Sequence, residues 1–291
     1  MKHTLNIWVV GGDQRQASMA ALMAEDGHTV HTYALDRLET PITGAAAQAD
    51  LTGAVLADCV VLPLPVADEE ARLNAPLSAQ SHPLGVILDA LRPGQAICAG
   101  RITAPVRAMA EQRGLTLHDY FAREELAVAN AVPTVEGAIQ IAMEALPITL
   151  HNARVLVIGY GRLGRLLAHR LDALGARVSA SARSWADLAW IEALGYGVEH
   201  TGQLKGWLCS YDLVINTVPA PVLDREALAD LKPECLVIDL ASKPGGVDLP
   251  NARALGVKVI QALSLPGRVA PVTAGRSVKN TVYNILHELG V

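Results

Sequence analysis

The chain has 291 residues, which is long for one hydrophobic core and predicts two domains of ordinary size. Hydrophobic residues make up 51% of the sequence and aromatic residues 4%, a balance typical of buried parallel strands of Val, Ile, Leu and Ala between helices. The formal net charge of −5 does not support nucleic-acid binding, which needs clustered Lys and Arg to neutralise phosphates.

The amino terminus and the cysteines are those expected of a cytoplasmic protein. The chain enters a strand-like segment at residues 5–10 soon after Met1, without a cleavable apolar region, so we predict no export. No apolar run approaches the roughly twenty residues of a membrane span, and we expect a soluble protein. The cysteines show neither metal-ligand spacing nor a CxxC pair, which predicts reduced thiols and no metal site. They are Cys59, Cys98, Cys209 and Cys235.

The first half of the chain alternates apolar, strand-like segments with helical ones. This alternation predicts a parallel sheet covered by helices. We assign residues 1–132 to this domain and expect it to carry the substrate and the catalytic groups. The predicted strands are Leu5–Val10, His28–Tyr33, Cys59–Leu64, Gln95–Ala99 and Thr116–His118.

A helix is predicted to bridge the two halves of the chain. Apolar residues follow one another at helical spacing from Asn130 to Leu150, with Pro133 and Thr134 near the start of the helix. The strand pattern then restarts at Arg154. Further strands are expected near Arg177, Tyr196, Asp212, Cys235 and Val257.

This tandem pattern predicts an α/β fold of two Rossmann-like, doubly wound parallel-sheet domains joined by the bridging helix. The second domain covers residues 133–276 and includes that helix. The last segment, Pro271–Val291, is also predicted to be helical, because its apolar residues form one stripe; residues of about 277–291 are expected to pack back on the first domain. Two domains of this kind predict a cleft between them.

A Gly-x-Gly-x-x-Gly turn opens the second domain. The run Gly159-Tyr160-Gly161-Arg162-Leu163-Gly164 lies between a short apolar strand and a helix. Gly159 permits the tight turn, Gly161 lets backbone amides approach a pyrophosphate, and Gly164 lets the helix pack closely on its strand. The turn predicts a dinucleotide site with the phosphates at the positive end of the helix. A purely structural glycine turn is the alternative.

The second strand of this domain ends in Ser181-Ala182-Arg183-Ser184, without an acidic residue. Enzymes selective for NAD usually place Asp or Glu here to accept a hydrogen bond from the ribose 2′-hydroxyl. Arg183 can instead form charge-assisted bonds with a 2′-phosphate, and Ser181 or Ser184 can donate further ones. We therefore predict NADP rather than NAD. The alternative is that Arg183 is a solvated residue before a helix.

Three loops with Pro or Gly are predicted at the carboxyl edge of the second sheet, where open parallel sheets bind their ligands. One such loop alone would mark an ordinary turn, but three at one edge predict a binding site. The loops are residues 217–221, 239–246 and 265–271. From the first two loops and the bridging helix we assign to the cofactor Thr217, Val218, Pro219, Ala241, Ser242 and Thr134.

Four segments, in this order, resemble the A subunit of dipicolinate synthase, and the resemblance covers essentially the whole chain. It implies oxidation of dihydrodipicolinate, a branch-point intermediate of lysine biosynthesis, to dipicolinate with reduction of NADP, in endospore formation. It also implies a partner, the B subunit of that enzyme, and a location in the mother-cell cytoplasm. The segments are Gly11-Gly12-Asp13-Gln14-Arg15, residues 130–140, residues 239–246 and Leu265-Pro266-Gly267-Arg268-Val269-Ala270-Pro271.

A dicarboxylate substrate needs cationic ligands. Arg15, just after the first strand and near a helix start, is the leading candidate, and Lys243 is the second; either residue can equally be a surface charge. Asp119 and Glu124 follow the last strand of the first domain and are candidates for moving a proton, although the dipole of a helix start also attracts acids. The sequence leaves the proton acceptor and a homo-oligomeric state open.

Two other functions remain compatible with the sequence. A 2-hydroxyacid dehydrogenase would share the two-domain layout but needs a histidine base from the later part of the cofactor domain, and the chain has no histidine between His200 and His287. A sensor or scaffold that binds NADP without turnover would need no anion-binding groups beside the cofactor, and the fold alone does not exclude it.

Overall fold

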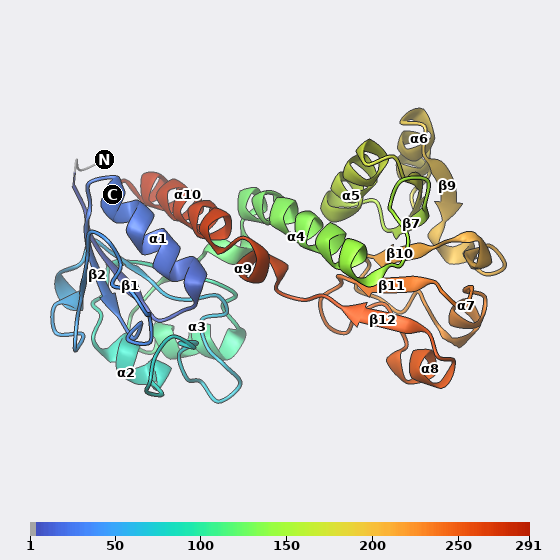
Figure 1. Ribbon diagram of the computed structural model, residues 1–291. Helices are drawn as coiled ribbons and strands as arrows, with labels where there is room; N and C mark the ends of the chain where they lie inside the picture. Colours follow the sequence, from blue (N-terminus) through green and yellow to red (C-terminus); the bar gives the residue numbers. More distant parts are fainter. Residues whose placement is uncertain (1–3) are drawn as a thin grey trace. The chain divides into compact units, whose positions relative to one another are not determined.

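The computed structural model describes residues 4–291, and this part of the chain forms two compact units (Figure 1). Unit 1 comprises the chain up to Asn130 together with Pro266–Val291, and unit 2 comprises Ala131–Leu265. Unit 2 is therefore inserted into the chain of unit 1. The first part of unit 1 ends at Asn130, close to the predicted boundary at residue 132, and its second part begins at Pro266, well before the predicted residue 277.

The described residues of unit 1 hold a six-stranded parallel sheet with the order β3-β2-β1-β4-β5-β6. Five of these strands correspond to predicted ones. The edge strand β3 was not predicted, because it consists of three alanines, which have low β propensity, and it gains its place by pairing with β2. The strands are β1 Asn6–Val10, β2 Thr29–Tyr33, β3 Ala45–Ala47, β4 Cys59–Val61, β5 Ala96–Ala99 and β6 Leu117–Asp119.

Helices cover both faces of this sheet (Figure 1). They are α1 Gln14–Glu25, α2 Leu84–Asp89, α3 Ala104–Glu111 and α10 Pro271–Leu289. Alternate residues of β1 serve the two faces, as the two-residue period of a strand requires. Ile7 and Val9 pack in the core that α1 and α10 complete, whereas Trp8 and Val10 pack in the core that α2 and α3 complete.

The carboxyl-terminal helix α10 lies beside α1 (Figure 1), and its apolar side chains share a core with Met19 of α1. The two helices approach closely at Gly275, where a Cβ atom would lie 2.5 Å from the backbone oxygen of Arg15. Each fully buried Val, Ile or Leu contributes about 1.5–3 kcal/mol, so α10 is an integral part of unit 1. Its buried stripe is Val278, Val282, Ile285 and Leu286, while Leu289 is exposed.

Unit 2 repeats this architecture. Its described residues form a six-stranded parallel sheet with the order β12-β11-β10-β7-β8-β9. Counted from the first strand of each unit, both sheets follow the order 3-2-1-4-5-6 of dinucleotide-binding domains, which confirms the predicted pair of Rossmann-like folds. The strands are β7 Arg154–Ile158, β8 Arg177–Ala182, β9 Gly197–His200, β10 Leu213–Asn216, β11 Leu236–Asp239 and β12 Lys258–Gln261.

The helices of unit 2 also cover both faces of its sheet. Val155 and Val157 of β7 pack with α5 and α6, and Leu156 and Ile158 pack with α7 and α8. These helices are α5 Arg162–Ala173, α6 Trp185–Ala193, α7 Arg225–Ala229 and α8 Leu249–Ala254. Shorter elements are the helix α9 Leu265–Val269 and the 3₁₀ turns η1 Ala54–Leu56, η2 Tyr120–Ala122, η3 Thr201–Gln203 and η4 Leu208–Ser210.

The bridging helix α4, Glu124–Ala145, begins earlier than predicted. Pro133 therefore lies inside the helix rather than near its start, although an interior proline costs about 3 kcal/mol. Two features offset this cost: acidic residues in the first turn suit the helix dipole, and apolar side chains are buried in both units, Leu126 in unit 1 and Val135 in unit 2. The predicted start of the helix was wrong because proline is most common in the first turn of a helix, and the prediction therefore placed Pro133 there.

By length and composition α4 also passes the test for a membrane span. Its most apolar 18-residue window has a mean hydropathy of 1.3, and 44% of that window is buried inside the protein. The sequence-based statement that no run approaches this length was therefore too strong. Core helices of soluble proteins pass the same test, and the burial of Val135, Ala138 and Ala142 in the core of unit 2 accounts for the apolar composition.

Candidate functional site

The glycine turn of unit 2 has the geometry that its sequence predicts. Gly159 has φ +96°, and a Cβ atom there would lie 2.5 Å from Oγ1 of Thr217. A Cβ atom on Gly164 would lie 1.9 Å from the carbonyl oxygen of Gly159, so α5 packs against the turn as only glycine allows. Gly161, by contrast, faces open space, with nothing within 4 Å of a Cβ atom. The first and third glycines thus shape the turn, and the second leaves room for a ligand.

The amino terminus of α5 is left open for an anion. Gly161 is the N-cap residue, and because it is a glycine no N-cap side chain accepts a hydrogen bond from the first-turn amides. These amides and the helix dipole favour a phosphate. Arg162 is exposed and Leu163 is half-buried at the first two helical positions. The residues present therefore fit the pyrophosphate of a dinucleotide.

The end of β8 presents one cation and no acid. Arg183 is exposed, and its side chain has no hydrogen bond or ion pair within residues 4–291. Ser184 is exposed and caps α6 by accepting from the Asp187 amide. Ser181 differs from the prediction, because its side chain is fully buried and its hydroxyl bonds to Oγ1 of Thr201 at 3.0 Å. Arg183 and Ser184 face solvent at this strand end, and Ser181 holds η3 instead.

A buried polar pair, which the sequence did not single out, organises the neighbouring loops. The Asn216 amide nitrogen donates to Oδ1 of Asp239 at 2.8 Å and to the Val218 carbonyl at 3.0 Å, and its oxygen accepts from the Val218 amide. Asp239 also accepts from the amides of Ala241 and Gly246. Asn216 and Asp239 are each at most 1% exposed. A polar residue at the last position of two otherwise apolar strands was the available signal.

The predicted loop residues lie around this pair at the carboxyl edge of the sheet. Thr217 and Val218 are half-buried and Pro219 is exposed, while Ala241 is buried and Ser242 exposed. The Thr217 hydroxyl donates to the Ile158 carbonyl at 2.9 Å, which ties the loop after β10 to the glycine turn. The structure thus brings the glycine turn and both loops to one place, the point between β7 and β10 where the strand order reverses and Rossmann-type sheets bind ligands.

Lys243 and Thr134 complete the set predicted for unit 2. Lys243 is exposed in the loop after β11 and makes no hydrogen bond or ion pair with the described residues. Thr134 is half-buried on α4 and has an interaction partner. Both remain predicted site residues.

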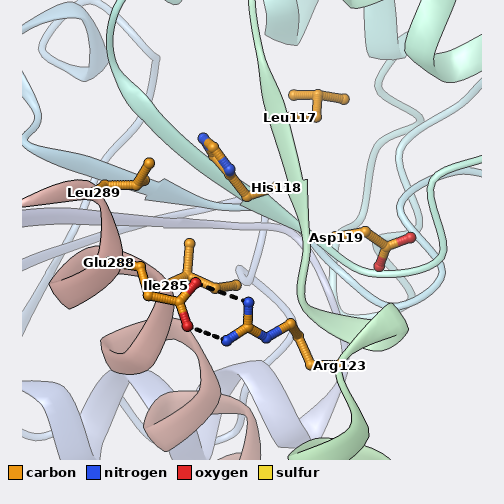
Figure 2. A pocket seen from close by; sticks show the side chains of 7 residues that line it. All are labelled: Leu117, His118, Asp119, Arg123, Ile285, Glu288 and Leu289. Atoms are coloured by element: carbon orange, nitrogen blue, oxygen red, sulfur yellow. Dashed lines mark hydrogen bonds and ion pairs between the residues drawn. The ribbon is translucent and has the colours of Figure 1, made fainter.

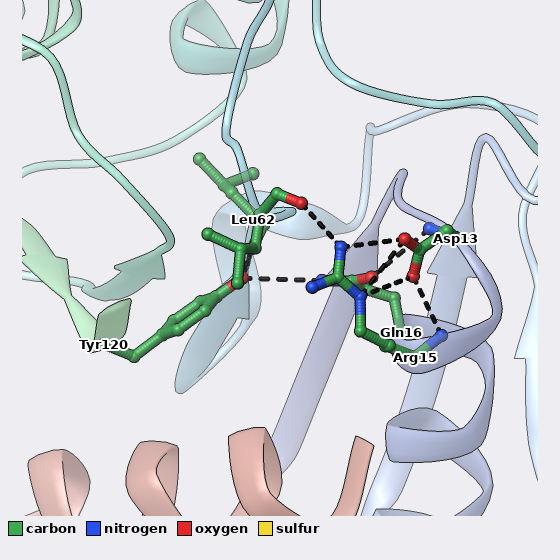
Figure 3. Close-up of polar contacts among 6 residues, drawn as sticks. Asp13, Arg15, Gln16, Leu62 and Tyr120 are labelled. Carbon is green, nitrogen blue, oxygen red and sulfur yellow. Dashed lines mark hydrogen bonds and ion pairs between the residues drawn. The ribbon is translucent and has the colours of Figure 1, made fainter. Parts of the chain in front are cut away.

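In unit 1 the equivalent helix terminus is closed by the protein itself (Figure 3). Asp13 is the N-cap of α1 and accepts from the Arg15 amide, and Gln16 accepts from the Asp13 amide, so the two side chains form a capping box. Gln16 is 1% exposed and fills the space above Gly12, where a Cβ atom would lie 2.5 Å from Cγ of Gln16. A phosphate has no place at this terminus.

Arg15 lies where the strand order of unit 1 reverses, between β1 and β4. Its Nε and Nη2 donate to the Asp13 carboxylate, and Nη2 also donates to the Leu64 carbonyl at 2.8 Å. Gly267 of α9 packs against the guanidinium, since a Cβ atom there would lie 3.0 Å from Nε of Arg15. Nη1 has no hydrogen bond within the described chain. The guanidinium is thus held in place with one nitrogen left for an anion.

A buried tyrosine supports this arrangement (Figure 3). The Tyr120 hydroxyl donates to the Leu62 carbonyl at 2.9 Å and accepts from Nε2 of Gln16 at 3.4 Å. Burial raises the pKa of Tyr120 far above its usual value, so the hydroxyl stays protonated and keeps its donor role. Tyr120 links the end of β6 to β4 and α1.

The acidic candidates of unit 1 have structural partners. The Asp119 carboxylate accepts from the backbone amides of Arg101, Ile102 and Phe121 at 2.9–3.0 Å. Three such bonds leave it anchored to the loop after β5, which favours a positioning role over proton transfer. Glu124 is exposed in the first turn of α4 and has an interaction partner.

Next to Asp119 lies a shallow hollow of about 230 Å³ with Arg123 at its edge (Figure 2). The Arg123 guanidinium forms a two-nitrogen ion pair with Glu288 of α10 and a further bond to Glu125. The hydrogen bonds to Glu288 raise the pKa of Arg123. This group therefore fastens the end of α10 to unit 1 and is not free to bind a substrate.

Comparison with known proteins assigns the two units to families. The family model of the N-terminal domain of the dipicolinate synthase A subunit matches residues 6–121. The A subunit of dipicolinate synthase from Bacillus subtilis is 34% identical to the chain, over 98% of the chain and 97% of the relative. The chain belongs to the family of dipicolinate synthase A subunits. The predicted resemblance is confirmed.

Solved structures agree with the family. The crystal structure of the Bacillus subtilis protein matches with 34% identity over 98% of this chain and 97% of that one, and a TM-score of 0.88. Its counterpart from Bacillus halodurans matches with 30% identity over 97% of each chain and a TM-score of 0.88. A transhydrogenase of Sinorhizobium meliloti, 19% identical over 97% of this chain and 94% of that one, shares the fold with a TM-score of 0.72.

The second family model identifies the type of cofactor. The NAD-binding domain of D-isomer specific 2-hydroxyacid dehydrogenases matches residues 127–244, which include the glycine turn, the loop after β10 and most of the loop after β11. Together with membership of the family, this match makes the chain an oxidoreductase with a nicotinamide cofactor. Most of the matched residues lie in unit 2.

Proposed function

We propose that the protein oxidises dihydrodipicolinate to dipicolinate with NADP as the cofactor. The observation that carries this proposal is the fixed Arg15 guanidinium at the switch point of unit 1, with one nitrogen available for a carboxylate. In unit 2 the uncapped terminus of α5 fits the cofactor phosphates. Arg15 in unit 1 is therefore not needed to bind them. Arg15 then serves a negatively charged substrate, which fits the activity named in the Bacillus subtilis relative.

The preference for NADP rests on the end of β8. Arg183 is exposed there without an ion-pair partner in the described chain, and Ser184 lies beside it with a hydroxyl hydrogen available. A guanidinium and a hydroxyl suit a 2′-phosphate, whereas NAD-selective sites present a carboxylate to the free ribose hydroxyl. Gly161, the α5 terminus and the loops around Asn216 would hold the rest of the dinucleotide.

The chemistry asks little of the protein beyond binding and orientation. Loss of a hydride and a proton turns the dihydropyridine ring into an aromatic pyridine, which drives the reaction forward; the bound nicotinamide supplies the hydride acceptor. Arg15, with Lys243 as a second candidate, would hold the substrate carboxylates and fix the ring. Glu124 remains the exposed acid proposed to take the proton, because the Asp119 carboxylate is occupied by backbone amides.

The Bacillus subtilis relative is named as one subunit of a synthase. This name supports a proposal about the partner and the location of the chain. We propose that the chain works beside a B subunit in the cytoplasm of the mother cell during endospore formation. Size-exclusion chromatography of the purified chain, alone and mixed with the B subunit, tests this association and gives the oligomeric state.

The decisive experiment mixes the purified chain with NADP and freshly generated dihydrodipicolinate, and follows reduced-cofactor absorbance and dipicolinate together. NAD is the cofactor control, and the reaction is run with and without the B subunit. Equal formation of both products with NADP preferred is the expected result. Cofactor binding without either product, with the B subunit present, would exclude the reaction and favour a sensor.

The 2-hydroxyacid dehydrogenase hypothesis has one observation in its favour, the match of residues 127–244 to that family's cofactor domain. Its histidine base has no equivalent between His200 and His287, and His200 itself accepts from the Gly202 amide at the start of η3. Lactate and 2-hydroxyglutarate, assayed with either cofactor, should therefore give no reduced cofactor.

A further inference from the structure

One charged residue of unit 1 has a backbone conformation that L-amino acids avoid. Among the described residues, the non-glycine positions with positive φ are Ala34, Ala71, Arg101, Asn152 and Ser264. Arg101, with φ +58°, directly follows Gly100 after β5, at the carboxyl edge of the sheet. A strained position that carries a long charged side chain, where glycine would be favoured, calls for an explanation in function.

The strain at Arg101 is held by a specific device. Asp119, at the end of the neighbouring strand β6, accepts from the Arg101 amide at 3.0 Å and from the Ile102 amide at 2.9 Å. The same carboxylate accepts from the Phe121 amide. Asp119 thus anchors the backbone amides of Arg101 and of the residue after it.

The Arg101 side chain is available to a ligand. It is exposed, and its guanidinium makes no hydrogen bond or ion pair with residues 4–291. Arg107, on the exposed side of α3 in the same unit, is likewise without a partner in this range, but its backbone is ordinary helix. The combination of strain, anchoring and an unpaired charge sets Arg101 apart from such surface arginines.

A continuous set of backbone contacts connects Arg101 to Arg15. Arg15 donates to the Leu64 carbonyl. The adjacent Pro63 carbonyl accepts from the Gly100 amide at 3.1 Å, and the Gly100 carbonyl accepts from the Val66 amide at 2.8 Å. Strands β1, β4 and β5 are neighbours, so the two arginines follow strands of one sheet, β1 and β5, that lie about two strand spacings, or roughly 10 Å, apart.

We propose that Arg101 binds the second carboxylate of the substrate, with Arg15 binding the first, and that Asp119 is the positioning residue that presents Arg101. The proposal rests on the proposed oxidation of a pyridine-type 2,6-dicarboxylate. Two guanidinium groups projecting from one sheet edge suit a rigid ligand whose two carboxylates diverge from one ring. Asp119 then acts through Arg101 and not on a proton.

The test measures binding of the product dipicolinate, and of picolinate, which has one carboxylate, to the holoprotein by titration calorimetry. The variant is Arg101→Gly, which removes the guanidinium while keeping a residue suited to positive φ. We expect about 10- to 100-fold weaker dipicolinate binding with unchanged picolinate binding, unchanged NADP binding and no loss of thermal stability. Equal weakening for both ligands, or no weakening for either, overturns the proposal.

Two control variants separate charge from backbone. Ala71→Gly relieves a positive φ in the same unit and should leave dipicolinate binding unchanged, and Arg107→Ala removes a nearby surface charge with the same expectation. Arg268→Ala probes the cation next to Gly267, which touches Arg15. If Arg268→Ala selectively weakens dipicolinate binding and Arg101→Gly does not, the second carboxylate belongs to α9 and the proposal is wrong.

The role of Asp119 is tested by a double-variant cycle. Asp119→Asn alone should weaken dipicolinate binding, and in the Arg101→Gly background it should cause no further loss, because the residue acts through Arg101. Additive losses contradict this role. If the wild type turns over dihydrodipicolinate but Arg101→Gly binds dipicolinate normally, this inference fails while the proposed function stands; if the wild type neither reacts nor binds dipicolinate, the proposed function itself fails.

Discussion

The two units have the same strand order but treat the helix after their first strand in opposite ways. In unit 2 the N-cap of α5 is Gly161, which has no side chain to cap the first-turn amides. In unit 1 the corresponding residue is Asp13, whose carboxylate caps α1 with the help of Gln16. One fold thus yields an open anion site and a closed one, and two positions make the difference. Rossmann topology alone does not imply a nucleotide.

The third glycine position shows the same contrast in packing. Gly164 lets α5 approach the turn, with the carbonyl of Gly159 where a Cβ atom would be. In unit 1, Gln16 takes this position, and its side chain bonds to the Asp13 amide and to Tyr120. The side chain that makes a phosphate site impossible in unit 1 also supports the fixed guanidinium of Arg15.

The largest effect is expected when the close approach in unit 2 is broken. Gly164→Ala places a Cβ atom 1.9 Å from a backbone oxygen, so the helix must shift, at a cost of about 3 kcal/mol. Thermal unfolding should show unit 2 destabilised and calorimetry should show no NADP binding. The matched control is Gly85→Ala, a glycine of helix α2 without a positive φ, where a Cβ atom would meet only the flexible end of the Arg113 side chain at 3.3 Å; a variant Gly164→Ala as stable as the wild type contradicts the packing argument.

Gly161→Ala separates ligand space from stability. Nothing lies within 4 Å of a Cβ atom at Gly161, so the free energy of unfolding should change by about 0.5 kcal/mol or less. The added methyl group occupies the approach of the pyrophosphate, and NADP binding should weaken about 100-fold. Unaltered NADP affinity would show that the phosphates bind elsewhere.

Arg183→Ala tests the cofactor preference at the end of β8. Loss of a charge-assisted contact with the 2′-phosphate should weaken NADP binding about 10- to 100-fold, while NAD binding stays the same. Fluorescence titration with both cofactors gives the ratio directly. Arg225→Ala, which removes an exposed arginine from α7 of the same unit, is the charge control, and a proportional loss for NAD and NADP would refute the assignment.

Opening the closed terminus of unit 1 should have a smaller effect on stability. Asp13→Ala removes the N-cap of α1, which costs about 1 kcal/mol, and it frees the Arg15 guanidinium from its carboxylate. We expect a slightly lower melting temperature and weaker dipicolinate binding, because Arg15 is no longer oriented. The control is Asp224→Ala, which removes the N-cap of α7 in unit 2; stronger dipicolinate binding by Asp13→Ala would mean that Asp13 competes with the substrate instead of orienting its ligand.

The smallest effect concerns the acid that follows the second strand of unit 1. The hydrogen bond from the Ala79 amide, together with one from the Ser78 hydroxyl, holds the pKa of Asp36 below its usual value. A depressed pKa in the folded state contributes stability above the unfolded value of about 3.9, and this contribution is lost as pH falls through the folded value.

Asp36→Asn should therefore lower the free energy of unfolding slightly at neutral pH, leave it nearly unchanged in strong acid, and so flatten the acid side of the stability profile below about pH 4. Urea unfolding at several pH values measures this. Asp172→Asn, an acid on α5 whose carboxylate has no hydrogen bond in the described chain, is the control. A profile for Asp36→Asn that is parallel to the wild type would contradict the assignment.

The fold was predictable from the sequence because buried parallel strands are continuous apolar runs. β1, β7 and β10 consist mostly of Val, Ile and Leu. The glycine turn predicts the strand before it, β7, and the helix after it, α5. What the sequence missed depends on tertiary contacts. β3 is a strand only because β2 pairs with it, and α4 continues through Pro133 because each of its halves carries side chains that are buried in a core.

The candidate site was predictable where a local sequence pattern is typical of one structural role. Gly159, Gly161 and Gly164 combine spacing with conformation, and the missing acid after β8 is a local signal. The side chains of Asn216, Asp239 and Ser181 have roles that depend on which strand ends are neighbours. Such roles follow from strand order, which emerges only when the sheet is assembled.

The insertion of unit 2 between the two parts of unit 1 has a consequence for synthesis. Met19 of α1 packs with the Val278–Leu286 stripe of α10, which follows unit 2 in the sequence. Until α10 leaves the ribosome, this apolar face of α1 has no partner, while every residue of unit 2 has already emerged. Unit 2 should therefore complete its folding before unit 1, although unit 1 is the first to be synthesised.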